Sequence, residues 1–177
     1  PGAERVGVYT YDGVGNRITE QLPNSSLRTH EYDDLNRREE SRDELGVFET
    51  MVYDPMGRVI ERTDAGGAAT LFDYDDLGRL EREDRPLERD RVLTYTIHGE
   101  IETETNGRNF TVTHHYDTLG RRISSDDAIG TQSFTYDDVG NQLTSTDRES
   151  RITTYTYDAL NRRLTQLDPA PPATTQA

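Results

Sequence analysis

The side chains best suited to chemistry in this sequence are aspartates that directly follow tyrosines. The pair occurs seven times, first at Tyr11-Asp12 and last at Tyr157-Asp158. A single tyrosine and carboxylate could act as a general acid and base, or could bind a sugar. A catalytic centre needs only one such arrangement, whereas this pair recurs along the whole chain. The recurrence favours a structural role, in which Asp caps turn amides and Tyr packs against its neighbours.

The spacing of these tyrosines defines a repeat of 21 residues, with a single interval of 20. A fixed period over the whole chain is typical of a repeat architecture. We number each repeat from its tyrosine as position 0, so that Asp is +1 and a glycine or asparagine is +4. Position +1 is Thr96 in the fifth copy. The repeat signature comprises Tyr11, Asp12, Gly15, Tyr32, Asp33, Asn36, Tyr53, Asp54, Gly57, Tyr74, Asp75, Gly78, Tyr95, Gly99, Tyr116, Asp117, Gly120, Tyr136, Asp137, Gly140, Tyr157, Asp158 and Asn161.

The signature predicts a tight hairpin turn in every repeat. Glycine and asparagine enter the left-handed backbone region most cheaply, and Asp at the first corner favours a type I turn. A type I turn followed by a left-handed residue makes a three-residue hairpin loop with a bulge. A second turn is expected about eleven residues after each tyrosine. Examples are Asp43-Glu44-Leu45-Gly46 and Arg85-Pro86-Leu87-Glu88, where proline again fits type I.

Two turns in each period leave room for two strands, which predicts sixteen strands of about six to eight residues and no helix. Positions −2 and 0 share one face and are mostly aromatic, apolar or His, whereas position −1 is mostly Thr or charged. The expected fold is all-β, a twisted and curved strip of antiparallel hairpins. Residues 1–168 form a single array, and the Pro-rich segment 169–177 is expected to be disordered.

Composition narrows the possible partners. The chain has 177 residues, a net charge of −14 and no cysteine, and only 31% of its residues are hydrophobic. The negative charge argues against nucleic acid, and no apolar run is long enough to insert into a membrane. The core must be thin and partly aromatic. Open sheet edges predict edge-to-edge self-association.

The motif resembles the YD repeat of the RHS family, whose pattern Tyr-Asp-x-x-Gly-Arg is seen at Tyr74–Arg79. The resemblance covers residues 5–168. In that family the hairpins form a long β-strip that spirals into a hollow shell. Its relatives include bacterial RHS toxins, the B and C components of insecticidal toxin complexes, and teneurins. The resemblance implies a secreted or cell-surface, non-catalytic segment of a shell. Its partners would be the rest of the parent shell and an enclosed C-terminal toxin or cargo domain.

Two stretches depart from the family pattern. The fifth copy replaces Asp and Arg by Thr96 and Glu100, which predicts a local irregularity. Toxin-bearing relatives end their shell with a self-cleaving segment that contains Asp-Pro-x-Gly. Asp168-Pro169-Ala170-Pro171 lacks the glycine, so no protease residues are assigned here.

No residue is assigned to catalysis, to a cofactor or to a metal. His30 and His114 occupy position −2 and are expected to pack. The acidic pairs at 33–34, 75–76, 126–127 and 137–138 lack the spacing of a calcium loop. Arginine at +5 is expected to stack on a tyrosine or to pair with an Asp of a neighbouring repeat.

The alternative function is an adhesion module, whose aromatic and Thr-rich ladders bind carbohydrate or a cell surface.

Overall fold

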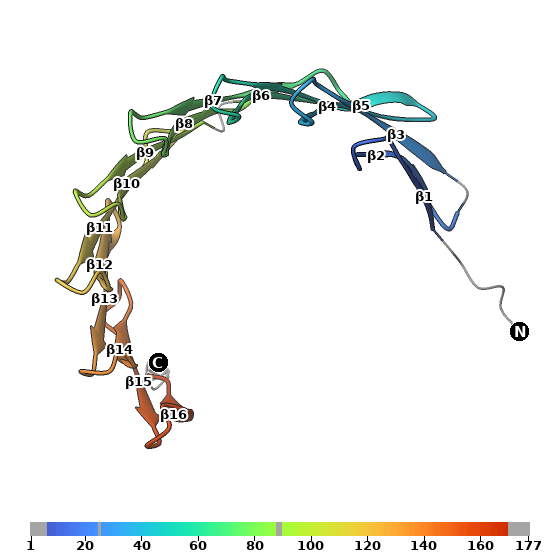
Figure 1. Cartoon of the computed structure of the whole chain (residues 1–177). Coiled ribbons are helices and arrows are strands. Elements are labelled where there is room, and N and C mark those ends of the chain that lie inside the picture. The colour runs from blue at the N-terminus through green and yellow to red at the C-terminus, as the bar shows by residue number, and fades with distance from the viewer. Residues whose placement is uncertain (1–6, 25, 88–89, 170–177) are drawn as a thin grey trace, which may run out of the picture. The chain divides into compact units, whose positions relative to one another are not determined.

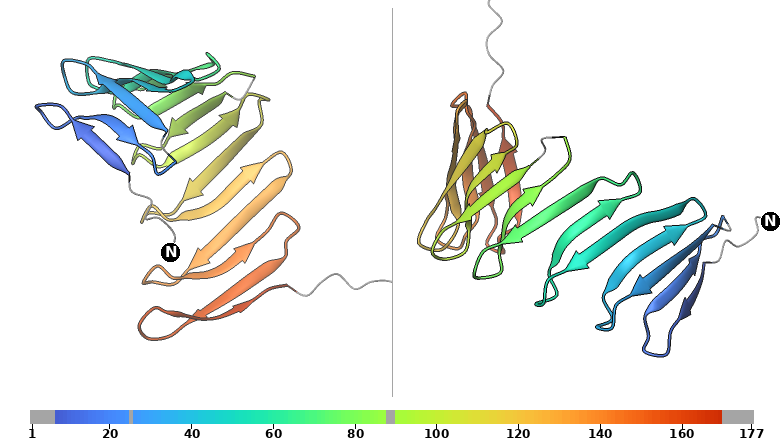
Figure 2. Two further views of the ribbon diagram at one scale, coloured as in Figure 1. Left: turned by 90° about the vertical axis from the view of Figure 1, so that its right-hand side faces the viewer. Right: turned by 90° about the horizontal axis from the view of Figure 1, so that it is seen from above.

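The computed structural model describes residues 7–24, 26–87 and 90–169. These residues form sixteen β-strands and no helix, which confirms the predicted all-β fold of antiparallel hairpins (Figure 1). The chain divides into two compact units, residues 1–91 and 92–177. Within each unit, every strand lies beside the next one along the chain (Figure 2).

Unit 1 contains four hairpins, each built from one strand that leads into a tyrosine and one that follows the turn. The strands are β1 (Val8–Tyr11), β2 (Arg17–Gln21), β3 (Leu27–Tyr32), β4 (Arg38–Asp43), β5 (Gly46–Tyr53), β6 (Val59–Asp64), β7 (Ala69–Tyr74) and β8 (Leu80–Asp84). All neighbouring pairs are antiparallel. Each of the four tyrosines is therefore the last residue of its strand.

Unit 2 repeats the arrangement. Its strands are β9 (Arg91–Tyr95), whose first residue closes unit 1, β10 (Ile101–Asn106), β11 (Thr111–Tyr116), β12 (Arg122–Asp127), β13 (Gly130–Tyr136), β14 (Gln142–Thr146), β15 (Ile152–Tyr157) and β16 (Arg163–Leu167). Strands β10 to β16 pair antiparallel in sequence order. The strands of the two units contain four to eight residues, so the predicted length of six to eight is too long for several of them.

The two faces of the sheet differ in burial. Five of the six buried residues in the described part of the chain occupy position −2 or position +9, which lie opposite each other as His30 and Ser41 do. Leu93, also at −2, is the only buried hydrophobic residue in the described part of the chain. Every residue at position −1 is exposed. The predicted division into two faces is therefore confirmed. We call the face with positions −2, 0 and +9 the Tyr face, and the face with −1 and +8 the Thr face.

The hairpin turns have the predicted backbone. In the second repeat the amide of Asn36 donates to the carbonyl of Asp33 at 2.9 Å, and the amide of Asp33 donates to the carbonyl of Arg37 at 2.9 Å. All eight residues at +4 have positive φ, from 60° at Asn161 to 100° at Gly99. Wherever the pairing across these turns is described, the register shifts between positions −1 and 0, opposite an extra residue at +7, so the predicted bulge is also present.

The second turns vary more than predicted. At Arg85-Pro86-Leu87 the residue with positive φ is Leu87 (67°), the third corner, which corresponds to type II rather than the predicted type I. Ser25 and Glu88, which complete two of the predicted turns, lie outside the described residues, as does most of the predicted disordered segment 169–177.

The single 20-residue interval also has a local cause. The loop between β12 and β13 contains only Ala128 and Ile129, and the pairing from Asp127↔Gly130 onward has an unbroken register. The loop between β4 and β5 is equally short, but there an extra residue, Phe48, is inserted between the pairs Arg42↔Val47 and Ser41↔Glu49. The bulge restores the period of 21 after the fourth strand, and its absence shortens the period after the twelfth.

Candidate functional site

The signature aspartate closes its own turn. In the second repeat, Asp33 Oδ1 accepts hydrogen bonds from the amides of Leu35 and Arg37, both at 2.9 Å. Its Oδ2 accepts a third from Nε of Arg37 at 2.6 Å. These bonds satisfy amides that the turn leaves unpaired, which confirms the capping role predicted for this residue. The same three bonds recur at Asp54, Asp75, Asp117 and Asp158.

These bonds also determine the charge of the aspartates. The amide of Arg79 lowers the pKa of Asp75, and the Arg79 side chain lowers it further. The amide at +5 likewise lowers the pKa of Asp117 and of Asp158. Each carboxylate is thus ionised at neutral pH with its lone pairs engaged by the turn. An aspartate in this state is poorly suited to general acid–base catalysis near pH 7.

The arginine at +5 joins two repeats. The guanidinium of Arg37 binds Asp33 in its own turn, stacks over the ring of Tyr53 with 4.6 Å to the ring centroid, and donates from Nη1 to the carbonyl of Asp54 at 3.1 Å. The predicted stacking on tyrosine is confirmed. The predicted ion pair with an Asp of a neighbouring repeat is wrong for this arginine, because the carboxylate it binds is four residues away in its own turn and the neighbour supplies a carbonyl.

The tyrosine hydroxyl makes the second bond between repeats. Tyr53 donates to the carbonyl of Arg38 at 2.7 Å, and Tyr74 donates to that of Val59 at 2.8 Å. The acceptor is in each case position +6 of the preceding repeat. The same bond is made by Tyr32, Tyr116, Tyr136 and Tyr157. Signature residues far apart in sequence are therefore brought together in pairs of adjacent repeats and not into one site.

In the fifth turn the side chain at +1 is the donor and the side chain at +5 is the acceptor, the opposite of the other turns, while the backbone hydrogen bonds are the same. The hydroxyl of Thr96 replaces the carboxylate and donates to Glu100, which replaces the arginine. The turn retains both backbone hydrogen bonds, from Thr96 to Glu100 at 2.9 Å and from Gly99 to Thr96 at 3.1 Å. The two backbone hydrogen bonds of this turn do not show the irregularity predicted for this copy, because a hydroxyl and a carboxylate link positions +1 and +5 as a carboxylate and a guanidinium do elsewhere.

Both histidines at −2 have packing roles. Nδ1 of His30 lies 2.9 Å from the hydroxyl of Ser41, and Nδ1 of His114 lies 2.8 Å from that of Ser125. Burial lowers the pKa of both imidazoles, and nearby arginines lower it further. His115 points to the opposite face and contacts Asp126 at 2.7 Å. The two adjacent histidines therefore do not share a ligand.

Metal-binding side chains do not gather in the described ranges, where no group of three or more His, Cys, Asp or Glu could hold an ion. Asp33, Asp75 and Asp137, from the acidic pairs noted in the sequence, are engaged by turn amides. Nor do residues 7–24, 26–87 and 90–169 contain a helix with the length and hydrophobicity required to cross a membrane.

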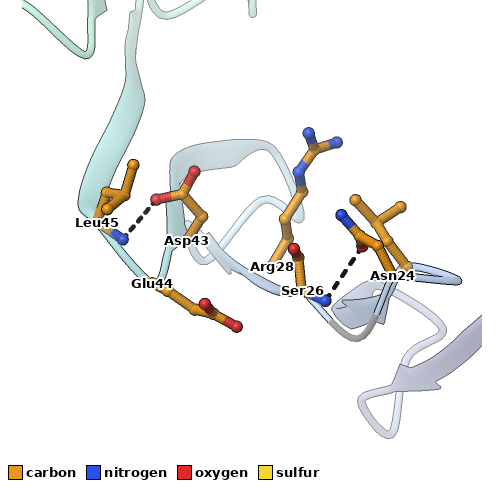
Figure 3. A pocket seen from close by; sticks show the side chains of 7 residues that line it. Asn24, Ser26, Arg28, Asp43, Glu44 and Leu45 are labelled. Carbon is orange, nitrogen blue, oxygen red and sulfur yellow. Dashed lines mark hydrogen bonds between the residues drawn. The ribbon is translucent and has the colours of Figure 1, made fainter.

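The cavities lie between neighbouring turns. One, of about 310 Å³, is lined by Leu22, Asn24, Ser26, Arg28, Asp43, Glu44 and Leu45 (Figure 3). Two of its polar groups are occupied, because Asp43 accepts from the amide of Leu45 at 2.8 Å and Asn24 accepts from that of Ser26 at 3.2 Å (Figure 3). Another, of about 320 Å³, lies beside His98, Glu100 and His115 in unit 2. The second cavity contains the hydroxyl of Thr96, which donates to Glu100, and this pair is the side-chain link that closes the fifth turn.

Sequence reasoning missed a row of exposed apolar side chains at position +3, at the tips of the signature turns. In unit 1 these are Val14, Leu35, Met56 and Leu77, which are 68% to 82% exposed. In unit 2 they are Leu119, Val139 and Leu160, which are 70% to 72% exposed. Each is a single apolar side chain at the tip of its own turn, and one such side chain recurs per repeat. The apolar type at +3 could be read from the sequence, but its exposure depends on the turn geometry.

The family model for the teneurin YD-shell matches residues 2–133, and the model for the RHS repeat matches residues 136–171. The chain therefore belongs to the teneurin YD-shell family, with RHS repeats completing its C-terminal part. No curated protein sequence matches it.

Solved structures show the same fold. A crystal structure of TcdB2–TccC3–Cdc42 matches with a TM-score of 0.79, 17% identity, and coverage of 89% of this chain and 10% of the solved chain. A structure of the Photorhabdus luminescens Tc holotoxin pore with TccC3-D651A matches with a TM-score of 0.76 and 18% identity, at the same coverage. The chain thus spans about a tenth of the length of the solved chains it matches.

Proposed function

We propose that this chain is a wall segment of a YD-repeat shell that encloses a toxin or other cargo domain, and that it has no catalytic activity of its own. The observation that carries the proposal is the use of the signature side chains. Tyr and Arg bind the neighbouring repeat, and Asp closes the turn that positions them. Side chains engaged in this way build a continuous wall.

The family and the matched toxin structures support a shell role. The enclosed domain would be the chief partner, together with the remaining repeats of the parent protein. The exposed row at +3 offers apolar surface for contact with further parts of such a strip. Family membership also supports secretion or display at the cell surface.

Limited proteolysis of the full-length parent tests this proposal. The expected result is a C-terminal domain that resists protease while the shell is intact and is digested once the shell is opened by denaturant. A matched sample of the isolated C-terminal domain gives the unprotected rate. Equal digestion rates for the enclosed and isolated domains would contradict encapsulation.

Carbohydrate binding by the Thr face remains a second candidate that the structure does not favour. Five Thr pairs on this face bond to each other across strands at 2.6 to 2.7 Å, as in Thr10 with Thr19. These hydroxyls are already engaged within the sheet. A reproducible hit on a glycan array probed with the folded chain would support carbohydrate binding.

A further inference from the structure

Position +5 of one repeat and position +4 of the next lie close together. Nη1 of Arg58 is 3.4 Å from the place that a Cβ on Gly78 would occupy, and Nη1 of Arg37 is 3.9 Å from that of Gly57. In unit 2, Oε1 of Glu100 is 3.0 Å from the corresponding place at Gly120, whereas Gly140 has no atom within 4 Å. In three of these four pairs, the long side chain at +5 thus reaches the space beside the left-handed residue of the next turn.

Two repeats have the shorter asparagine side chain at +5, and in both it contacts the next +4 residue through a hydrogen bond. Nδ2 of Asn16 donates to Asp12 in its own turn at 2.9 Å and to Oδ1 of Asn36, the next +4 residue, at 2.9 Å. In unit 2, Nδ2 of Asn141 donates to Asp137 at 2.8 Å and to Oδ1 of Asn161 at 2.9 Å. An asparagine at +4 thus supplies the acceptor that a shorter +5 residue can reach.

The sequence pairs these two positions without exception. Each long charged residue at +5 is followed by glycine at the next +4, and each asparagine at +5 is followed by asparagine. The first group is Arg37–Gly57, Arg58–Gly78, Arg79–Gly99, Glu100–Gly120 and Arg121–Gly140, and the second is Asn16–Asn36 and Asn141–Asn161.

We propose that positions +5 and +4 form a matching pair that determines which repeats can be neighbours. Glycine leaves the space that a long side chain occupies while it stacks on the next tyrosine, as Arg58 does on Tyr74 at 4.6 Å. Asparagine at +4 fills that space and keeps a left-handed φ, 62° at Asn36, at little cost. Matched pairs keep every contact between repeats, whereas mixed pairs either crowd the space or leave Asn at +5 without its acceptor. This rule depends on the repeat array and not on what the shell encloses.

A double-mutant cycle at Arg58 and Gly78 tests the proposal. Gly78→Asn in the wild-type chain is expected to lower Tm by roughly 2–4 °C, the change typical of about 1 kcal/mol in a chain of this size. In the Arg58→Asn background the same change should raise Tm, because it restores an Asn–Asn pair. The reversal of sign is the decisive result, and a change of the same sign in both backgrounds would overturn the proposal.

Gly15→Asn is the matched control, since Gly15 has a similar positive φ (98°) and no atom within 4 Å of an added Cβ. Its effect on Tm should be the same in both backgrounds.

A second double-mutant cycle, at Asn16 and Asn36, tests the proposal if a variant of the first cycle fails to fold. Asn36→Gly should lower Tm in the wild-type chain and raise it in Asn16→Arg. If the effects of Asn16→Arg and Asn36→Gly simply added, the proposal would be wrong even if Gly78→Asn could not be studied.

Discussion

At the scale of single residues, the tyrosine hydroxyl makes a side-chain hydrogen bond between repeats. Tyr74 spans from the end of β7 to the carbonyl of Val59 in the preceding hairpin, at 2.8 Å. Burial raises the pKa of Tyr74, so its hydroxyl is a donor at all physiological pH values. The link is neutral and therefore insensitive to salt.

Removing this hydroxyl should weaken the array locally. Tyr74→Phe is expected to reduce the free energy of unfolding by about 0.5–1.5 kcal/mol, the net value of one hydrogen bond, as measured by urea denaturation. Tyr11→Phe is the matched control, because Tyr11 lies in the outer strand β1 and is 59% exposed. Equal losses for the two variants would show that the hydroxyl acts through something other than the link between repeats.

The buried side chain of His30 predicts a dependence of stability on pH. Burial lowers the pKa of His30 below its ordinary value of 6.5, so the unfolded chain binds more protons than the folded chain in this range. The stabilising contribution is therefore complete above pH 6.5 and is lost as pH falls towards the folded pKa. Tm should fall between pH 7 and pH 5, and His30→Phe, which uses a residue found at −2 elsewhere, should fall less. A parallel decline in the variant would rule out this cause.

At the scale of the hairpin, the left-handed residue at +4 is the main conformational requirement. Gly13 and Gly15 lie in the same turn, and neither has an atom within 4 Å of an added Cβ. They differ in backbone, since only Gly15 has positive φ, at 98°. The pair therefore separates backbone strain from crowding.

Gly15→Ala should destabilise the chain by about 1–2 kcal/mol, the cost of a left-handed L-residue, as measured by urea denaturation. Gly13→Ala should be neutral or stabilising by up to about 1 kcal/mol, because it restricts only the unfolded chain. If both alanine variants had the same stability, the φ assignment at +4 would not account for the choice of glycine.

The fifth turn predicts an exchange of partners. Thr96→Asp alone should lower Tm, because its carboxylate would face Glu100 where a hydroxyl now donates. Combining it with Glu100→Arg should recover stability by restoring the Asp–Arg pair of the other turns. Circular dichroism melts of the two variants measure both effects. A double variant less stable than Thr96→Asp would contradict the equivalence of the two turn chemistries.

Much of the hairpin was predictable because its determinants are local. Asp33 and Asn36 specify their turn within four residues, and the alternation around His30 specifies the two faces. The contacts between repeats were harder to predict from the sequence. The bond from Tyr53 reaches a carbonyl fifteen residues away, which no composition pattern reveals. The turn at Leu87 also departed from expectation, since proline at the second corner is compatible with both type I and type II.

At the scale of the whole molecule, the outer strands and the net charge act in opposite directions. Within the described residues, β1 and β16 pair with a strand on one side only, and Arg162 next to β16 is 74% exposed, compared with 26% for Arg37. Such edges favour association with another strand. A net charge of −14 opposes it, so association should depend on salt.

We therefore expect the mean molecular mass in light scattering to rise with protein concentration, and to rise more steeply in 0.5 M than in 0.05 M salt, where screening is weaker. Arg162→Glu should reduce the association, because Glu adds negative charge at the edge and cannot stack on a tyrosine ring. A mass that stays monomeric under all conditions would contradict this expectation.

Electron microscopy of the full-length parent protein tests the central proposal most directly. We expect a hollow shell whose wall contains this segment, with density for a separate domain inside. An open assembly with no enclosed volume, or a closed shell that is empty in the intact protein, would contradict the proposal that this segment forms the wall around a cargo.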